Sequence, residues 1–225
     1  LAPAATIVEE ELIRALATQA GWPQGEGTFT SGGSNANMLA MLLARDRMFP
    51  DAMDKGVDGT RLAVFVSAEC HYSLLMSAHV LGIGMEGVIK VATDHHGVMC
   101  MDALREAIES CDRAPFCVVA TAGTTVRGAF DPISEIADLC EEHGLWLHVD
   151  AGFGMGGNQR AGRFANRTVR DVPGLVGVTL RVGRERDEVE GILEILAALR
   201  NDPQIEIPDL AVPDDDERLF LQVLS

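Results

Sequence analysis

Residues 117–157 read CVVATAGTTVRGAFDPISEIADLCEEHGLWLHVDAGFGMGG, and this stretch decides the fold. An apolar run is followed by a polar turn, an amphipathic segment and a second apolar run that reaches Asp150. Apolar runs that alternate with amphipathic segments are typical of parallel strands connected by helices. The pattern predicts strands at 117–122 and 145–151, with a helix over 133–144 between them.

The same alternation occurs earlier in the chain. LAVFVS and VIKVAT predict short strands at 62–67 and 88–93, and the segments after them predict helices over 71–81 and 101–110. We therefore expect an α/β fold in which a parallel sheet is covered by helices on both faces. The loops that follow the strands should meet at one edge of the sheet, which is where open α/β sheets bind their ligands.

The N-terminal part adds two helices and a glycine-rich turn. Apolar residues at helical spacing predict a helix over 4–20. The turn GEGTFTSGGSNAN at 25–37 leads into MLAMLLARDRMF, which favours a helix over 38–49. Ser34 or Asn35 is a natural N-cap for this second helix.

Composition limits the possible partners. The 18 basic and 34 acidic residues give a net charge of −16, which disfavours nucleic acid and anionic membranes as partners. No apolar run is long enough to span a bilayer. The five cysteines are odd in number and form no CxxC pair, so we expect reduced thiols, no metal site and a cytoplasmic protein.

The glycine turn is a candidate phosphate site. A predicted helix is preceded by Ser31, Gly32, Gly33, Ser34 and Asn35, so that backbone N–H groups and hydroxyls surround the positive end of the helix dipole. Glycine–serine turns are also common as plain N-caps, so the turn alone leaves both interpretations open.

Other candidate residues follow the strand ends. His71 could stack on a flat heteroaromatic ring or take part in acid–base steps, or it could simply cap the next helix. Thr121, Thr124 and Thr125 offer hydroxyl groups at the next strand end, although threonines are also ordinary turn residues.

Asp150 is the most informative of these residues. A carboxylate that follows the apolar strand LWLHV needs a partner, because burying an unpaired charge is costly. A protonated pyridine nitrogen would be such a partner. Backbone N–H groups or a magnesium ion are the alternatives.

Together these motifs resemble the group II pyridoxal-phosphate (PLP)-dependent amino-acid decarboxylases, and especially the glutamate and cysteine-sulfinate decarboxylase branch. The matching segments are FTSGGSNANMLAMLLAR, ECHYS with the downstream LGIG, and ATAGTTVRGAFDPISEIADLCEEHGLWLHVDA. The resemblance implies the PLP-dependent transferase fold of type I. Such proteins have a large α/β domain and a small C-terminal domain, and they form homodimers with their sites at the interface.

The resemblance also assigns roles to residues of this chain. Asp150 would pair with the pyridinium nitrogen, and His71 would stack over the ring and assist protonation of the substrate carbon. Gly152 would lie beside the ring, at a position where the family usually has alanine. The cofactor contacts implied in this way are Gly33, Ser34, His71, Thr124, Thr125, Asp150 and Gly152, with His71 also catalytic.

The family's cofactor lysine has no counterpart in the expected place. Family members bind PLP covalently through a lysine that follows the aspartate, whereas the two lysines here, Lys55 and Lys90, both precede Asp150. We expect Lys55 to lie in a polar connector and Lys90 in a strand away from the carboxyl edge, both solvated. The resemblance thus implies that a block of the large domain is missing.

Four segments follow from this interpretation. Residues 1–157 would form a partial PLP-binding large domain, and 158–173 an irregular junction. Residues 174–201 would be a remnant of the small C-terminal domain, and 202–225 an acidic tail.

The resemblance predicts a lyase of amino-acid metabolism that decarboxylates a small acidic L-amino acid, such as glutamate, aspartate or cysteine sulfinate. The absent lysine supports an alternative, a non-catalytic relic that binds PLP or phosphate weakly or acts as a dimerising partner. The match across GTTVRGAFDPISEIAD disfavours a third possibility, a carbon–carbon lyase of the same fold type.

Overall fold

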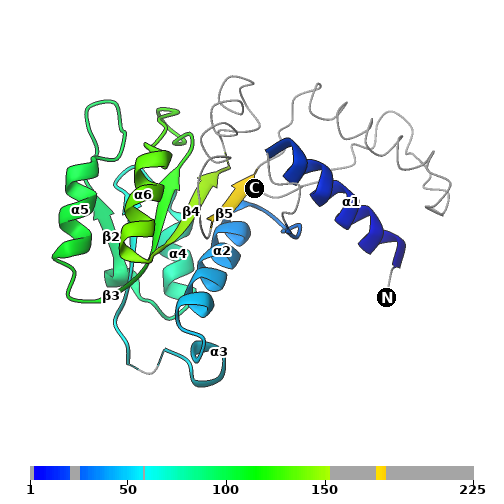
Figure 1. The fold of residues 1–225 in the computed structure, drawn as a ribbon, viewed down its shortest axis with the longest axis horizontal. Coiled ribbons are helices and arrows are strands. Elements are labelled where there is room, and N and C mark those ends of the chain that lie inside the picture. Colours follow the sequence, from blue (N-terminus) through cyan, green and yellow to red (C-terminus); the bar gives the residue numbers. More distant parts are fainter. Residues whose placement is uncertain (1–2, 21–25, 58, 153–175, 181–225) are drawn as a thin grey trace.

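The structure is a computed structural model that describes residues 3–20, 26–57, 59–152 and 176–180 of the 225-residue chain. Its centre is a five-stranded, fully parallel sheet with the strand order β2-β1-β3-β4-β5 (Figure 1). The strands are β1 (Leu62–Ser67), β2 (Val88–Val91), β3 (Ala114–Thr121), β4 (Trp146–Ala151) and β5 (Val176–Leu180).

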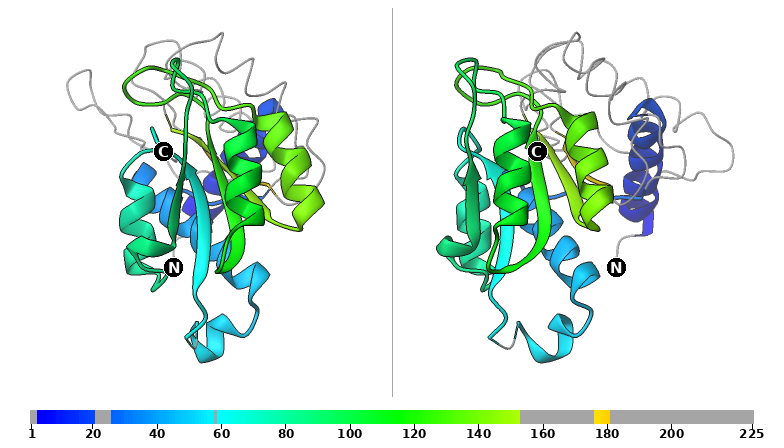
Figure 2. Two further views of the ribbon diagram at one scale, coloured as in Figure 1. Left: turned by 90° about the vertical axis from the view of Figure 1, so that its left-hand side faces the viewer. Right: turned by 60° about the vertical axis from the view of Figure 1, so that its left-hand side comes forward.

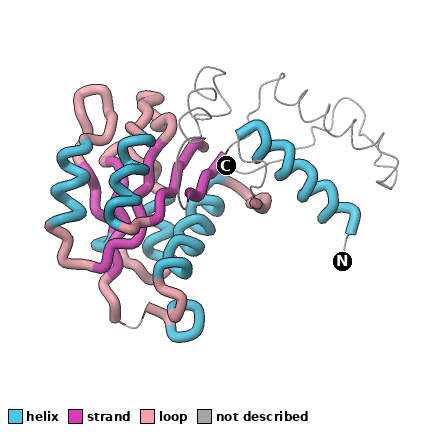
Figure 3. Tube along the Cα trace, viewed as in Figure 1, coloured by secondary structure: helices cyan, strands magenta, loops and turns pink. Residues whose placement is uncertain are grey.

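Helices cover both faces of this sheet, as the sequence predicted. One face carries α2 and α4, and the other carries α5 and α6, whereas α1 lies to one side (Figures 2 and 3). The helices are α1 (Pro3–Ala20), α2 (Gly33–Met48), α3 (Ala52–Lys55), α4 (Ser73–Val80), α5 (Met101–Glu109) and α6 (Ile133–His143), with a 3-10 turn η1 (Met85–Gly87). Within the described ranges, no helix has the length and apolar character needed to cross a membrane.

The sheet has a separate hydrophobic core on each face, because successive side chains of a strand point to opposite faces. In β4, Leu147, Val149 and Ala151 belong to the cluster beneath α5 and α6, whereas Trp146 packs against the cluster beneath α2 and α4. The same alternation turns His148 and Asp150 toward α2. Strand periodicity therefore decides which helix can contact the candidate carboxylate.

Most element boundaries agree with the sequence prediction, and α2 is the main exception. The helix begins at Gly33 with Gly32 as its N-cap, so the predicted caps Ser34 and Asn35 lie inside the first turn. Gly32 has φ 160°, and its carbonyl accepts the N–H groups of Asn35 and Ala36 at 2.9 Å. A backbone cap of this kind needs no side-chain oxygen, which is why residue preference alone misplaced it.

Strand β5 is a second difference. The sequence analysis placed this stretch in a small-domain remnant at 174–201, whereas residues 176–180 pair in parallel with β4 and extend the main sheet. A short apolar strand carries no local signal of the edge with which it will pair. The predicted junction at 158–173 and the tail at 202–225 lie outside the described residues.

Candidate functional site

The candidate site lies at the carboxyl edge of the sheet, on the face covered by α2. Thr121 ends β3 and is the register partner of Asp150 near the end of β4. Because paired residues of neighbouring parallel strands point to the same face, both side chains turn toward α2. His71 lies in the loop after β1, which reaches the same edge.

Asp150 is buried, with 8% of its surface exposed. Its Oδ2 accepts a hydrogen bond from Asn37 Nδ2 at 2.9 Å, and its Oδ1 accepts the backbone N–H of Gly152 at 3.1 Å. A Cβ atom at residue 152 would lie 3.2 Å from Oδ1, so glycine at this position relieves crowding against the carboxylate. Among the described residues, no cationic side chain forms a salt bridge with Asp150.

Asn37, in the second turn of α2, is the hub of the site, and the sequence analysis missed it. Besides Asp150, its Nδ2 contacts Ser73 Oγ at 3.0 Å, and its Oδ1 lies 2.9 Å from His148 Nε2. All four side chains are buried. In the sequence Asn37 ends the glycine-rich turn at 25–37, where asparagine is an ordinary turn residue, so no local signal marked it.

His71 connects to this hub through Ser73. The Nδ1 atom of His71 lies 2.8 Å from Ser73 Oγ and 3.3 Å from the backbone nitrogen of Ser73. The ring packs against Tyr72, with 4.4 Å between ring centroids. The structure thus joins two sequence-predicted residues, His71 and Asp150, by way of two that sequence reasoning did not single out.

The predicted phosphate site lies close to the hub. Gly33 and Ser34 are the first two residues of α2, and the first N–H groups of a helix have no partner within it. Gly33 precedes Asn37 by four residues, or about 6 Å along the helix axis. A helix N-terminus and a buried carboxylate therefore lie near each other.

The three threonines after β3 differ in their surroundings. Thr124 is buried, and its Oγ1 accepts the backbone N–H of Ala129 at 3.0 Å, which closes the loop. Thr125 is exposed. Thr121 is buried, and its Oγ1 has no hydrogen-bond partner within the described part of the chain. This unpaired hydroxyl belongs to the residue that pairs in register with Asp150.

Asp131 is a second buried carboxyl near this edge. It accepts the backbone N–H groups of Met99 and Thr121, both at 2.8 Å, and so ties two loops to the end of β3. Burial raises the pKa of Asp131 to about 6, although both hydrogen bonds act in the opposite direction. Sequence reasoning missed this residue because its two donors are 32 and 10 residues away in the chain.

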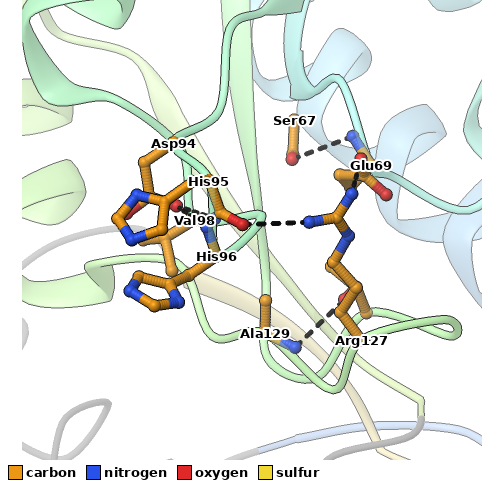
Figure 4. A network of polar contacts seen from close by, with 9 residues as sticks. Ser67, Glu69, Asp94, His95, His96, Val98, Arg127 and Ala129 are labelled. Atoms are coloured by element: carbon orange, nitrogen blue, oxygen red, sulfur yellow. Dashed lines mark hydrogen bonds and ion pairs between the residues drawn. The ribbon is translucent and has the colours of Figure 1, made fainter.

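Arg127 links the loops at the same edge (Figure 4). Its guanidinium donates to the carbonyl of His95 at 3.1 Å and lies 3.8 Å from the carboxylate of Glu69. Asp94 accepts the N–H groups of Val98 and His96, and these bonds, chiefly that from Val98, lower the pKa of its carboxyl. The loops after β1, β2 and β3 are therefore joined to one another.

The position predicted for Lys90 needs correction. Lys90 pairs with Val66, one residue before the end of β2, so it lies near the carboxyl edge and not away from it. Its side chain is exposed. Burial raises the pKa of Cys70 to about 11, and the charge of Lys90 partly opposes this rise. Lys55 is exposed in α3, which the sequence analysis treated as a connector, and forms an ion pair with Asp51 at 2.8 Å.

Comparison with known proteins decides the family. The model of the pyridoxal-dependent decarboxylase conserved domain matches residues 1–170. The chain belongs to the pyridoxal-dependent decarboxylase family. This result confirms the resemblance, and with it the type of cofactor that the family uses.

Individual members show the same relation. The chain is 50% identical over 158 residues to the acidic amino acid decarboxylase of Bos taurus. The aligned stretch covers 68% of this chain and 30% of that protein. The chain is 46% identical over 158 residues to human cysteine sulfinic acid decarboxylase, covering 68% of this chain and 32% of that protein. The chain thus spans about a third of the length of these decarboxylases.

Solved structures of decarboxylases confirm the fold. A crystal structure of mouse CSAD has a TM-score of 0.71 and 41% identity to this chain, covering 80% of this chain and 38% of that one. A glutamate decarboxylase domain from Vibrio parahaemolyticus has a TM-score of 0.65 and 27% identity, covering 80% of this chain and 40% of that one. The predicted α/β fold of type I, present as a partial domain, is confirmed.

The described residues fit the family's cofactor. Asp150 is a buried carboxylate without a salt bridge to any described side chain, and the neighbouring Thr121 hydroxyl lacks a partner. Both features suit a polar ligand with a protonated ring nitrogen. The individual cofactor contacts inferred from the resemblance stay predictions. They are Gly33, Ser34, His71, Thr124, Thr125, Asp150 and Gly152.

Proposed function

We propose that this protein takes part in the PLP-dependent decarboxylation of a small acidic L-amino acid, and that the described residues supply the site that holds the cofactor. The observation that carries the proposal is the buried Asp150, which is held by Asn37, a residue about one helical turn from the N-terminus of α2. The similarity to acidic amino acid and cysteine sulfinic acid decarboxylases supports the substrate class.

Each residue has a defined part in this proposal. The N–H groups of Gly33 and Ser34 bind the phosphate, and the Asp150 carboxylate holds a proton on the ring nitrogen. His71 lies over the ring, and the hydroxyl groups of Thr124 and Thr125 contact its edge. PLP, when bound, draws electrons from the bond between the α-carbon and the carboxylate, which is the bond that decarboxylation breaks. We further propose that the protein acts as a cytoplasmic homodimer.

The lysines of this chain favour a second candidate function. Lys90 is in β2 and Asp150 in β4, and these strands are separated by three strand spacings, or about 14 Å. A lysine side chain is roughly 6 Å long, so Lys90 is too far away to reach a ring beside Asp150. Lys55 lies in α3 and is already paired with Asp51. This chain by itself would then bind PLP without a covalent bond, as a non-catalytic relic or a dimerising partner.

Cofactor binding to the full chain separates these possibilities. Absorbance titration with PLP should show saturable binding, and an Asp150→Ala variant should bind at least about tenfold more weakly, because the ring nitrogen loses its counter-charge. Asp138→Ala, which removes an exposed carboxylate from α6, is the matched control. Equal affinity of the Asp150→Ala variant and the unmodified chain would contradict the proposed site.

Borohydride treatment then tests covalent attachment. If the chain forms a complete active site, reduction in the presence of PLP fixes the cofactor to a lysine, which peptide mass mapping locates. If binding is saturable and no lysine is modified, the second candidate function holds for this chain. Decarboxylation of aspartate, glutamate and cysteine sulfinate, measured as released CO₂, identifies the substrate.

A further inference from the structure

Three buried polar side chains at the site and the half-buried His71 form one continuous chain of hydrogen bonds. It runs from Asp150 to Asn37 at 2.9 Å, from Asn37 to Ser73 at 3.0 Å, and from Ser73 to His71 at 2.8 Å. Asn37 and Ser73 are 2% and 1% exposed, so bulk water does not compete for these bonds. Such a chain has a direction, because each bond has one donor and one acceptor.

Asp150 sets that direction at one end. A carboxylate can only accept hydrogen bonds, so the Asn37 atom facing it must be the amide nitrogen. The same nitrogen is within bonding distance of Ser73 Oγ, and its two hydrogens serve both acceptors. The amide oxygen then faces His148 Nε2 at 2.9 Å, which requires the proton of the neutral His148 ring to lie on Nε2.

Ser73 passes the direction on to His71. Its oxygen accepts from Asn37, which leaves its own hydrogen for His71 Nδ1 at 2.8 Å. The backbone N–H of Ser73 points to the same Nδ1 at 3.3 Å. Two donors directed at one ring nitrogen make that nitrogen an acceptor, so the neutral ring carries its proton on Nε2.

We propose that Asn37 and Ser73 are positioning residues that transmit the acceptor character of Asp150 to His71 and fix the neutral His71 ring with its proton on Nε2. One hydrogen-bond chain then orients both Asp150, which binds the ring nitrogen of the cofactor, and His71, which lies over that ring. The tautomer follows from the hydrogen bonds alone, and only its use in protonating a substrate carbon rests on the proposed function.

The decisive variant is Asn37→Asp, which keeps the shape of the side chain. An amide nitrogen donates two hydrogens, whereas a carboxyl oxygen carries at most one. Asp150 takes that one hydrogen, so the Ser73 hydroxyl must turn and donate to residue 37. Ser73 Oγ then becomes an acceptor for His71, which leaves only the backbone N–H of Ser73 as a donor to Nδ1 and raises the fraction of His71 with its proton on Nδ1.

The imidazole nitrogens of the full chain, labelled with ¹⁵N and free of PLP, report these tautomers by NMR. The unmodified chain should show Nε2–H for both His71 and His148, and Asn37→Asp should raise the Nδ1–H fraction of His71 while His148 stays Nε2–H. Asn35→Asp is the matched control, because it makes the same change at an exposed position two residues earlier in α2 and should leave His71 unchanged.

A second variant keeps the test independent of how well Asn37→Asp folds. Ser73→Ala removes the closer donor to Nδ1 and should raise the Nδ1–H fraction of His71, whereas Ser77→Ala, an equally buried serine on α4, should not. An Nδ1–H ring in the unmodified chain, or equal spectra for Ser73→Ala and Ser77→Ala, would overturn the proposal. PLP titration is a separate measurement, so failure of the proposed function would not be mistaken for failure of the hydrogen-bond chain.

Discussion

At the scale of single residues, Asp131 should make stability depend on pH. Its pKa is about 6 in the folded chain against a usual 3.8, so the folded state holds the proton more tightly. Its contribution is therefore fully present below pH 3.8 and lost as pH rises through about 6. The unfolding free energy of the unmodified chain, relative to Asp131→Asn, should fall by roughly 3 kcal/mol over this range. Urea titrations at several pH values measure the difference, and parallel pH profiles for the two proteins would contradict it.

At the scale of elements, the turn η1 should depend on Gly87, where the chain enters β2. A Cβ atom there would lie 2.7 Å from the carbonyl oxygen of Leu62 and 2.7 Å from Ile83 Cγ2. Because the first of these atoms is backbone, Gly87→Ala should lower the unfolding free energy by about 1–3 kcal/mol in urea titrations. Gly27→Ala, whose added Cβ would lie at an ordinary 3.4 Å from Ile13 Cγ2, serves as the control. An equal effect of the two substitutions would show that η1 can shift freely.

At the scale of the whole molecule, the sheet separates two cores that should behave independently. Ile83 belongs to the cluster beneath α2 and α4, and Ile136 to the cluster beneath α5 and α6. Each Ile→Val change should cost about 0.5–1.5 kcal/mol, and the double variant should equal their sum within about 0.5 kcal/mol. A double-mutant cycle of thermal or urea unfolding measures this, and a larger coupling energy would mean that the sheet transmits packing changes between its faces.

The sequence by itself determined the order and type of most elements, because strand and helix periodicity are local properties. The strand at 62–67 matches β1, and the helix over 133–144 ends within one residue of α6. Asp150 could be singled out for the same reason, since an acid after an apolar strand is visible in a short window of sequence. The four-residue helix α3 was missed because a stretch this short has no periodicity to detect.

Only the tertiary structure decided how the site is connected. Asn37 reaches Asp150 across 113 residues of sequence and His148 across 111, and no local pattern encodes contacts of this range. The edge that β5 extends and the place of Lys90 at the carboxyl edge also depend on strand register. Sequence periodicity fixes which face of an element is apolar, whereas the partners of buried polar groups follow from how distant elements pack.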